Sequence, residues 1–378
     1  MDALGELVYL PSAVSAGGKA FLARVAVNEL AYPAKFAAKK LPAGLKIDAA
    51  TGVISGTPTK PGHYVAEVTV TSGLNSKVKK PLTVEFDIAN YTDDRIPIED
   101  SYGPYYVGVS AEEQIDAAAG CTVSGLPSGL KWTAKDILDT KTKQVKTAAN
   151  TVYGIPTKAC TNTVYFKKSV KELVNGKQKT VTHQASATFI VEGMKPWAVG
   201  AFNGGSSNGM VQLTVAKTGK IGGKWMSEGL TWTLSAASFD AYISSEQMYV
   251  ATVIGKSGKL AMTNEIEVTE SGEESELFEA WRNGWKEDPW KSIAVQLKDR
   301  KVTVGEGNNI ELTIGASGTV KAKGSFDGLD GKPYSASCST VLIPTETEGQ
   351  YKVYLYFPPK SVKFVGWASV VTVQLGSI

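Results

Sequence analysis

The fold is set by residues 41–58, which read LPAGLKIDAATGVISGTP. Short apolar runs alternate there with turn residues: Pro42 fixes φ, and Gly44 and Gly52 allow the positive φ of tight corners. A β-branched Val-Ile pair supplies a short strand, and the Gly-Thr-Pro that follows ends it. The stretch therefore predicts strand, turn, strand and turn in succession, which is typical of a small β domain.

A weaker copy of this unit follows as LPSGLKW at 126–132 and VYGIPT at 152–157. Two copies predict two tandem domains, which we place at residues 1–90 and 91–193. In the first domain the run 64–71 alternates apolar and polar residues, so one face can pack inward while the other meets water. Short strands at this spacing predict two-sheet, Ig-like sandwiches.

Residues 194–378 form a region of another kind, with a repeat of its own. The segment LTVAKTGKIGGK at 213–224 aligns with LTIGASGTVKAK at 312–323, and each indicates a strand, a glycine-containing turn and a strand. Eight or more antiparallel strands with two internal copies are best closed as a barrel, because closure removes unpaired edges. The chain is therefore predicted to be all-β: two tandem sandwiches and then a larger antiparallel barrel.

One short helical insertion is expected in the barrel region, at residues 273–286. Phe278, Trp281 and Trp285 are spaced i, i+3 and i+7 and would share one face of a helix. Pro289 would end the pattern. The glutamates at the start of the segment suit a helix N-terminus, so they give no basis for naming a pair of catalytic carboxylates.

Composition limits the classes of protein that the chain can represent. Its 378 residues suit two to four domains, and 43% hydrophobic and 20% charged residues are ordinary for a globular protein. The net charge of +3, from 40 basic and 37 acidic residues, gives no indication of nucleic-acid binding by bulk charge. No apolar run is long enough to span a membrane.

The N-terminus, MDALGE, has neither a basic region nor an apolar core, and so shows no secretory signal. The protein is then either cytosolic or a segment of a longer secreted precursor. Tandem β modules usually lie inside larger chains, which favours the segment.

Tryptophan is concentrated in the third region, which holds seven of the eight. Exposed tryptophans could stack on sugar faces and form a carbohydrate-binding platform. Buried ones would instead fill the barrel and cap one end, and large aromatic side chains are well buried on average. We favour burial and keep three residues as candidate ligand-binding groups: Trp281, Trp285 and Trp290.

Three cysteines leave two interpretations open. Cys121 and Cys160 fall in the same predicted domain and could form a disulfide, which would indicate an oxidising compartment. They could equally be two buried thiols. Cys338 is expected to be an unpaired core residue.

No motif for catalysis, a metal or a cofactor is found. The two histidines, His63 and His183, fall in different predicted domains and lack clustered partners for a zinc site or a Ser-His-Asp triad. The glycine-rich run 204–209 lacks the Lys-Ser/Thr of a phosphate loop. Asp93-Asp94 and Glu99-Asp100 could hold calcium, although a solvated acidic linker is the preferred interpretation. No enzyme activity, cofactor or metal ligand is therefore predicted.

The pattern L-P-x-G-L-x-x-D-x-x-T-G-x-I-x-G-T-P-T-x-x-G-x-Y at 41–64 resembles the He_PIG repeat of bacterial surface proteins, an Ig-like module related to cadherin domains. The second domain is similar but lacks the Asp-x-x-Thr-Gly turn, with Thr133 where the first copy has Asp48. The resemblance implies Ig-like sandwiches in large, secreted, multi-module proteins with adhesive or structural roles. It supplies no catalytic residues.

These observations predict a non-catalytic extracellular bacterial module for adhesion, display or spacing within a larger surface protein. The alternative is a module that binds a glycan or another ligand through barrel aromatics. An enzyme or an accessory domain of one is a third possibility. A monomer is expected, with a cell-surface glycan or protein as the partner and no nucleic acid or direct membrane span.

Overall fold

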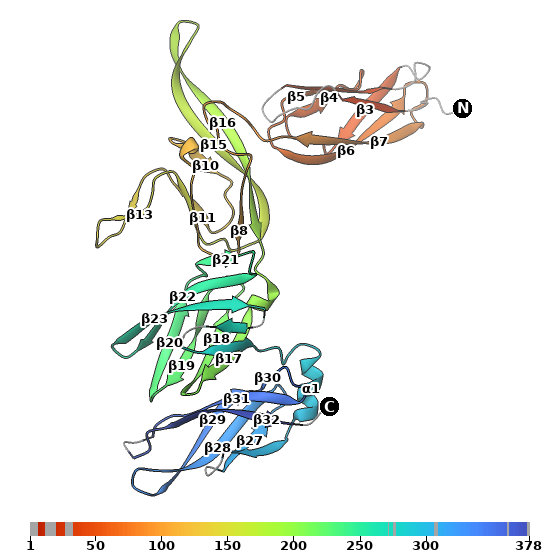
Figure 1. The fold of residues 1–378 in the computed structure, drawn as a ribbon. Coiled ribbons are helices and arrows are strands. Elements are labelled where there is room, and N and C mark those ends of the chain that lie inside the picture. Colours follow the sequence, from red (N-terminus) through yellow and green to blue (C-terminus); the bar gives the residue numbers. More distant parts are fainter. Residues whose placement is uncertain are drawn as a thin grey trace. The chain divides into compact units, whose positions relative to one another are not determined.

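The computed structural model describes residues 7–11, 20–26, 33–270, 272–274, 277–305, 309–360 and 363–375. These residues form an all-β protein with a single α-helix among them (Figure 1). The chain divides into two compact units. Unit 1 comprises Met1–Pro104, Glu112–Tyr153 and Cys160–Ile190, and unit 2 comprises Tyr105–Ala111, Gly154–Ala159 and Val191–Ile378. The three-part division at residues 90 and 193 stays a prediction.

The N-terminal part of unit 1 packs two antiparallel sheets around one core. The first sheet has the order β1-β2-β5-β4, with β1 (Val8–Pro11), β2 (Phe21–Ala26), β4 (Leu45–Ile47) and β5 (Val53–Gly56). The second has the order β3-β6-β7, with β3 (Ala34–Lys39), β6 (Gly62–Ser72) and β7 (Lys79–Ile88). Ala66, Val68 and Val70 of β6 are buried while the residues between them are more exposed, as the alternating pattern predicts.

The stretch 41–58 folds as its residues predict. Strands β4 and β5 pair with Leu45 opposite Gly56 and Ile47 opposite Ile54. The turn between them is held by Asp48, whose carboxylate accepts hydrogen bonds from the Thr51 hydroxyl at 2.8 Å and the Thr51 backbone N–H at 2.8 Å, which lower the Asp48 pKa. Gly44 has φ +94°, and a Cβ there would lie 2.0 Å from the carbonyl oxygen of Thr57, so no larger residue fits.

The rest of unit 1 contains a long hairpin and shorter strands. Strands β15 (Cys160–Val174) and β16 (Lys177–Glu192) are joined by Asn175 and Gly176, both with positive φ, as an Asn-Gly turn predicts. They lie in the sheet β10-β15-β16-β8, and β11-β14-β9 and β12-β13 form two further sheets. The remaining bounds are β8 (Ser101–Tyr106), β9 (Ala111–Gln114), β10 (Thr122–Ser124), β11 (Leu130–Thr133), β12 (Ile137–Leu138), β13 (Val145–Thr147), β14 (Thr151–Gly154) and the 3-10 helix η2 (Asp116–Ala118).

The largest sheet of unit 2 is a curled, nine-stranded antiparallel sheet, which follows the 3-10 helix η3 (Pro196–Ala198). Its order is β20-β19-β18-β17-β25-β24-β23-β22-β21, and β20 also pairs with β22. The curled sheet surrounds a core that includes Phe202, Trp225, Tyr249 and Ile266. The bounds are β17 (Gly200–Ser206), β18 (Gly209–Val215), β19 (Ile221–Ser227), β20 (Leu230–Ala236), β21 (Ala241–Ile243), β22 (Met248–Ser257), β23 (Leu260–Thr269), β24 (Gly272–Glu274) and β25 (Glu279–Arg282).

Two smaller sheets, β26-β27-β28-β29 and β30-β31-β32, complete unit 2 and enclose a second core together with helix α1 (Trp290–Leu297). Both predicted hairpins are present: β18 pairs with β19, and β27 pairs with β28. The bounds are β26 (Lys301–Val304), β27 (Ile310–Ile314), β28 (Thr319–Asp327), β29 (Pro333–Val341), β30 (Ile343–Pro344), β31 (Gln350–Phe357) and β32 (Trp367–Gln374).

The helix predicted at 273–286 is wrong. The segment contains β24 and β25 instead, and α1 starts at Trp290, directly after Pro289 rather than before it. The aromatic residues have a helical spacing, but burial in this segment has a period of two. Phe278 and Ala280 face the core of the curled sheet, while Trp281 packs in another cluster. Proline is tolerated at the beginning of a helix, where its missing N–H costs nothing.

Candidate functional site

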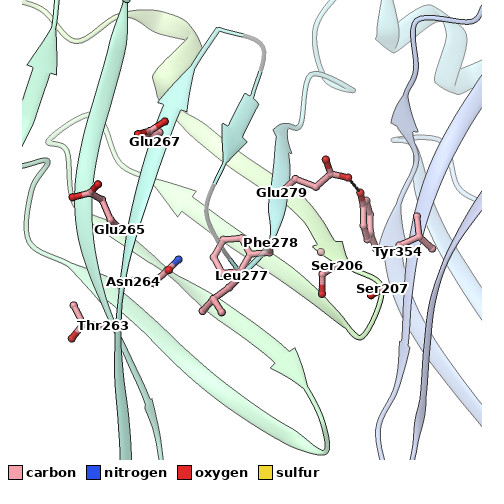
Figure 2. Close-up of a pocket in the computed structure, with 12 residues that line it drawn as sticks. Ser206, Ser207, Thr263, Asn264, Glu265, Glu267, Leu277, Phe278, Glu279 and Tyr354 are labelled. Atoms are coloured by element: carbon pink, nitrogen blue, oxygen red, sulfur yellow. Dashed lines mark hydrogen bonds between the residues drawn. The ribbon is translucent and has the colours of Figure 1, made fainter.

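A hollow of about 920 Å³ opens in the wall of the curled sheet (Figure 2). Among the described residues the strands on one side of it are short: β23 has 10 residues, while β24 has 3 and β25 has 4. Among the described residues, β23 pairs with β22 along its length but with β24 only at Glu267–Thr269. We call this hollow the notch; its lining is Gly205, Ser206, Ser207, Thr263, Asn264, Glu265, Glu267, Leu277, Phe278, Glu279, Tyr354 and Val370.

The walls of the notch come from separate strands. Figure 2 shows Thr263, Asn264, Glu265 and Glu267 along β23, opposite the end of β17 and the side chain of Tyr354 from β31. Between them, Leu277 is 39% exposed, and it precedes the buried Phe278. The lining therefore combines hydroxyl, amide and carboxylate groups with an apolar patch.

One carboxylate of the notch is already engaged. The Tyr354 hydroxyl donates a hydrogen bond to Glu279, and Lys352 Nζ lies 3.2 Å from the same carboxylate oxygen. Burial and this carboxylate both raise the Tyr354 pKa, which keeps the phenol protonated and donating. Within the described part of the chain, Glu265 and Glu267 are exposed and have no salt-bridge partner, so they carry the uncompensated negative charge of the notch.

Asn264 brings an unpaired donor to the same wall. Its side-chain nitrogen is buried and has no hydrogen-bond partner among the described residues. A buried polar atom left unpaired costs about 1–3 kcal/mol, because it has given up its hydrogen bonds to water. An incoming acceptor at this position would recover that cost.

The three tryptophans proposed as ligand-binding groups lie around one pocket of about 330 Å³. Trp285 is 3% exposed and its Nε1 donates to the Leu342 carbonyl at 2.8 Å, while Trp281 and Trp290 are half-buried. On the rim, Arg282 makes a two-pronged bond to Glu287, at 2.9 and 2.6 Å, which lowers the Glu287 pKa. We call this hollow the tryptophan pocket; whether it binds a ligand stays a prediction.

Other predicted aromatic positions divide between core and periphery. Trp225 is buried in the core of the curled sheet, where its ring centroid lies 5.2 Å from that of Phe278 in a tilted arrangement. Trp232 packs against that core from a half-buried position, and Trp367 does the same at the second core. The preference for buried tryptophans therefore fits Trp225, while Trp232 and Trp367 are only half-buried.

The cysteines are free thiols in the structure. Thr122 lies opposite Lys167 in the β10–β15 ladder, which places Cys121 beside the middle of β15, while Cys160 begins that strand. Seven or eight residues of strand span roughly 25 Å, and a disulfide needs Cα atoms within about 7 Å. The strand register therefore separates the two thiols. Cys338 is half-buried, and burial raises the pKa of its thiol to about 11.

Sequence reasoning missed the surroundings of His183 in unit 1. Its Nδ1 lies 2.9 Å from Asp93 and its Nε2 lies 3.0 Å from Glu172, which also pairs with Arg95 at 3.2 Å. The hydrogen bond to Asp93 is the largest cause that raises the His183 pKa, so the imidazolium is favoured. The two carboxylates bind opposite ring nitrogens and do not converge on one point, and the described residues contain no cluster suited to a metal ion.

The comparisons with known proteins concern the N-terminal part and a limited share of the chain. Residues 9–87 match the family model He_PIG, described as "Putative Ig domain". The chain is 29% identical over 154 residues, or 39% of its length, to the "Serine-rich adhesin for platelets" of Staphylococcus aureus strains MRSA252 and USA300. The match covers 10% and 6% of those two adhesins, so the chain corresponds to a tenth or less of their length.

Two solved structures from Bacteroides fragilis were also found, one named as a putative alpha-galactosidase and the other as a putative alpha-galactosidase/melibiase. The first is 22% identical, covers 24% of this chain and 19% of its own, and has a TM-score of 0.20. The second is 21% identical, covers 29% and 22%, and has a TM-score of 0.19. Scores this low carry no argument about fold or activity.

In the described residues, no α-helix combines the length and the apolar character that crossing a bilayer requires. The family match covers the pattern at 41–64 on which the resemblance was based. The turn at Asp48 and the two-sheet core lie in the same segment. Residues 9–87 of this chain therefore match the He_PIG family of putative Ig domains.

Proposed function

We propose that the chain is a non-catalytic module of a bacterial surface protein, in which unit 1 spaces and displays unit 2 for adhesion. The single observation that carries this proposal is the match of residues 9–87 to the He_PIG family, in a chain that is also similar over part of its length to a staphylococcal protein named as an adhesin. Small β modules of this kind bury their own cores and need no ligand to fold, which suits a role as a spacer.

The proposed architecture is two Ig-like sandwiches, at residues 1–90 and 91–193, followed by a third region at 194–378 in which β17 to β25 form a barrel. Support for the sandwiches comes from the two sheets around one core in the first domain. Support for the barrel comes from the pairing of β20 with both β19 and β22, which would close the sheet and leave only β21 outside the ring.

Antibody labelling of intact bacteria tests the surface role directly. Cells that express the full-length gene should bind an antibody raised against this chain without being permeabilised, and brief protease treatment of whole cells should remove the signal. A signal that appears only after lysis would contradict the proposal. An antibody against a cytosolic protein serves as the control for intact cells.

A second candidate function is glycan binding at the tryptophan pocket. The observation that favours it is the convergence of Trp281, Trp285 and Trp290 on one hollow, with Arg282 and Asn283 also in its lining. Aromatic faces stack on sugars, and flanking polar groups can bond to hydroxyls.

A glycan array followed by titration of tryptophan fluorescence tests this second function. Binding should quench or shift the emission, and Trp290→Ala should weaken it at least tenfold while Trp232→Ala leaves the affinity unchanged. Trp290 is half-buried beside Trp285, whereas Trp232 lies on β20 and does not line the tryptophan pocket. The absence of any glycan that binds would leave the spacer role alone.

A further inference from the structure

The notch lies where β23 extends beyond its described pairing with β24. At one boundary of the notch a row of paired residues crosses four strands. Glu267 of β23 pairs with Glu274 of β24, which pairs with Glu279 of β25, and Glu279 pairs with Gly205 of β17. Beyond that row no described residue of β24 or β25 pairs with β23, which continues to Leu260. In the described part of the chain, residues 260–266 of β23 therefore have a ladder partner on one side only.

The width of this gap suits polypeptide. Neighbouring strands lie about 4.8 Å apart, so two strand positions between β23 and β17 span roughly 14 Å, part of which Leu277 fills. A strand with one free side presents unpaired N–H and C=O groups along that side, which is a template for another strand. The volume of about 920 Å³ is near the upper end of the roughly 300–1,000 Å³ typical of ligand sites.

The negative charge of the notch favours a positively charged partner. Glu265 and Glu267 are two residues apart on β23, so they project from the same face and lie beside successive same-face residues of any strand added there. A cationic residue at every second position of the incoming strand would meet both carboxylates. The third carboxylate, on Glu279, is already engaged by Lys352 and Tyr354.

Asn264 gives an independent indication of a missing partner. Its buried side-chain nitrogen lacks an acceptor among the described residues, and it lies in the wall of the notch between residues 263 and 265. Peptide carbonyls are strong acceptors, and a strand laid along β23 would bring a row of them to this wall.

We propose that the notch is a strand-acceptor site, in which an extended peptide segment of a partner protein, with basic residues at alternate positions, adds to the free edge of β23. Main-chain hydrogen bonds would supply affinity, and the pairing of basic side chains with Glu265 and Glu267 would supply preference and register. The inference deepens the proposed surface role by naming a class of partner, and it rests on that role.

Fluorescence anisotropy with a labelled synthetic peptide, Thr-Lys-Val-Lys-Val-Lys-Val-Thr with blocked ends, tests the proposal on the full chain. Saturable one-to-one binding is expected. A second peptide of the same sequence carries an N-methyl group on every backbone amide, which blocks both hydrogen-bonding edges and keeps the charges. It should bind at least tenfold more weakly, and equal binding of the two peptides would overturn the proposal.

A pair of matched variants tests the site. The double change Glu265→Lys and Glu267→Lys should weaken peptide binding at least tenfold. Glu346→Lys with Glu348→Lys makes the same change of charge, at the same spacing, on exposed residues outside the notch lining, and should leave binding unchanged. All four residues are exposed, so circular dichroism should show that both variants keep the fold.

Several results would sink the inference. The first is the absence of saturable peptide binding, and the second is equal weakening of binding by both double variants. The third is protection of the amides of residues 260–266 from hydrogen exchange that depends only on the concentration of the chain, because the occupant would then be a second copy of the chain. Peptide binding without labelling of intact cells would remove the surface role alone. Labelling without peptide binding would remove the strand-acceptor site alone.

Discussion

The two hairpins of unit 2 share a sequence pattern and a turn but are covered in different ways. In the first, Gly219 donates to the Ala216 carbonyl at 2.9 Å, and in the second, Gly318 donates to the Gly315 carbonyl at 3.2 Å. A Cβ on Gly219 would lie 2.2 Å from the backbone oxygen of Gly108, and a Cβ on Gly318 would lie 2.2 Å from the ring of Trp285. Local sequence thus sets the hairpin, and more distant residues decide what packs on it.

The regions around the hairpins differ in how completely their strands pair. In the curled sheet, β23 extends past its short neighbours and leaves the notch. In the second region, β28 has β27 on one side and β29 on the other, and its core is filled by residues from both small sheets and α1. One copy of the hairpin belongs to a sheet with a gap, and the other packs on a core enclosed by two sheets and a helix.

The largest expected effect comes from Trp285→Ala, which removes the indole that covers the second hairpin. Trp285 is 3% exposed, packs on Tyr351 and Trp290, and donates to Leu342. Truncation of a buried tryptophan costs about 3–5 kcal/mol of unfolding free energy. Urea denaturation followed by circular dichroism measures it for the transition that involves the second core.

Trp232→Ala serves as the control for that loss. Trp232 is half-buried against the core of the curled sheet, so its truncation should cost clearly less than the truncation of Trp285. Equal losses would mean that the indole of Trp285 does not hold the second hairpin as described.

The two turn glycines should tolerate alanine less well than an open one. Gly219 (φ +79°), Gly318 (φ +66°) and Gly258 (φ +60°) all have positive φ, but a Cβ on Gly258 would meet nothing within 4 Å. The left-handed conformation should lower the free energy of unfolding of all three alanine variants by about 1–2 kcal/mol. Overpacking should lower it by about 1–3 kcal/mol more in the two covered turns. Thermal unfolding of the three variants measures the difference, and equal losses would contradict the covered-turn geometry.

Asn264→Leu should raise the stability of unit 2 by about 1 kcal/mol, because it removes the unpaired buried donor and keeps a side chain of similar size. The same change should weaken binding of the Lys-Val peptide. Calorimetry and anisotropy on one protein sample measure both effects. A loss of stability with unchanged peptide binding would show that the Asn264 amide has a structural partner instead.

A change of pH should have the smallest effect and act on unit 1, because both histidines of the sequence lie there. The folded pKa of His183 is raised above 6.5, so its contribution is complete below pH 6.5 and is lost as pH rises through the folded value. The melting temperature of the unit 1 transition should therefore fall as pH rises above 6.5.

His183→Gln should remove most of that dependence, and His63→Gln should remove less, because His63 has one carboxylate partner, Asp87, while His183 has two. An equal shift in the transitions of unit 2 would show that pH acts elsewhere. Differential scanning calorimetry of the three proteins at several pH values makes the comparison.

Local signals predicted the strands of this chain well. Residues 41–58 carry their own turn chemistry, and the hairpins at 213–224 and 312–323 carry theirs, so no distant contact was needed to place them. The error at 273–286 arose because three aromatic residues fit a helical spacing by coincidence, while burial alternates with a period of two.

The candidate sites depend on contacts between distant residues. The notch follows from the difference in length between β23 and its neighbours, which no local motif encodes. His183 meets Asp93 across 90 positions of the sequence. The tryptophan pocket was easier to anticipate, because Trp281, Trp285 and Trp290 lie within ten residues of one another.

Hydrogen–deuterium exchange of backbone amides tests the contrast between the open and the paired strand most directly. In the free chain, every second amide of residues 260–266 should exchange fast, while all amides of residues 320–323 of β28, which are paired on both sides, exchange slowly. Addition of the Lys-Val peptide should slow the fast set and leave β28 unchanged. Uniformly slow exchange across residues 260–266 in the free chain would contradict the account.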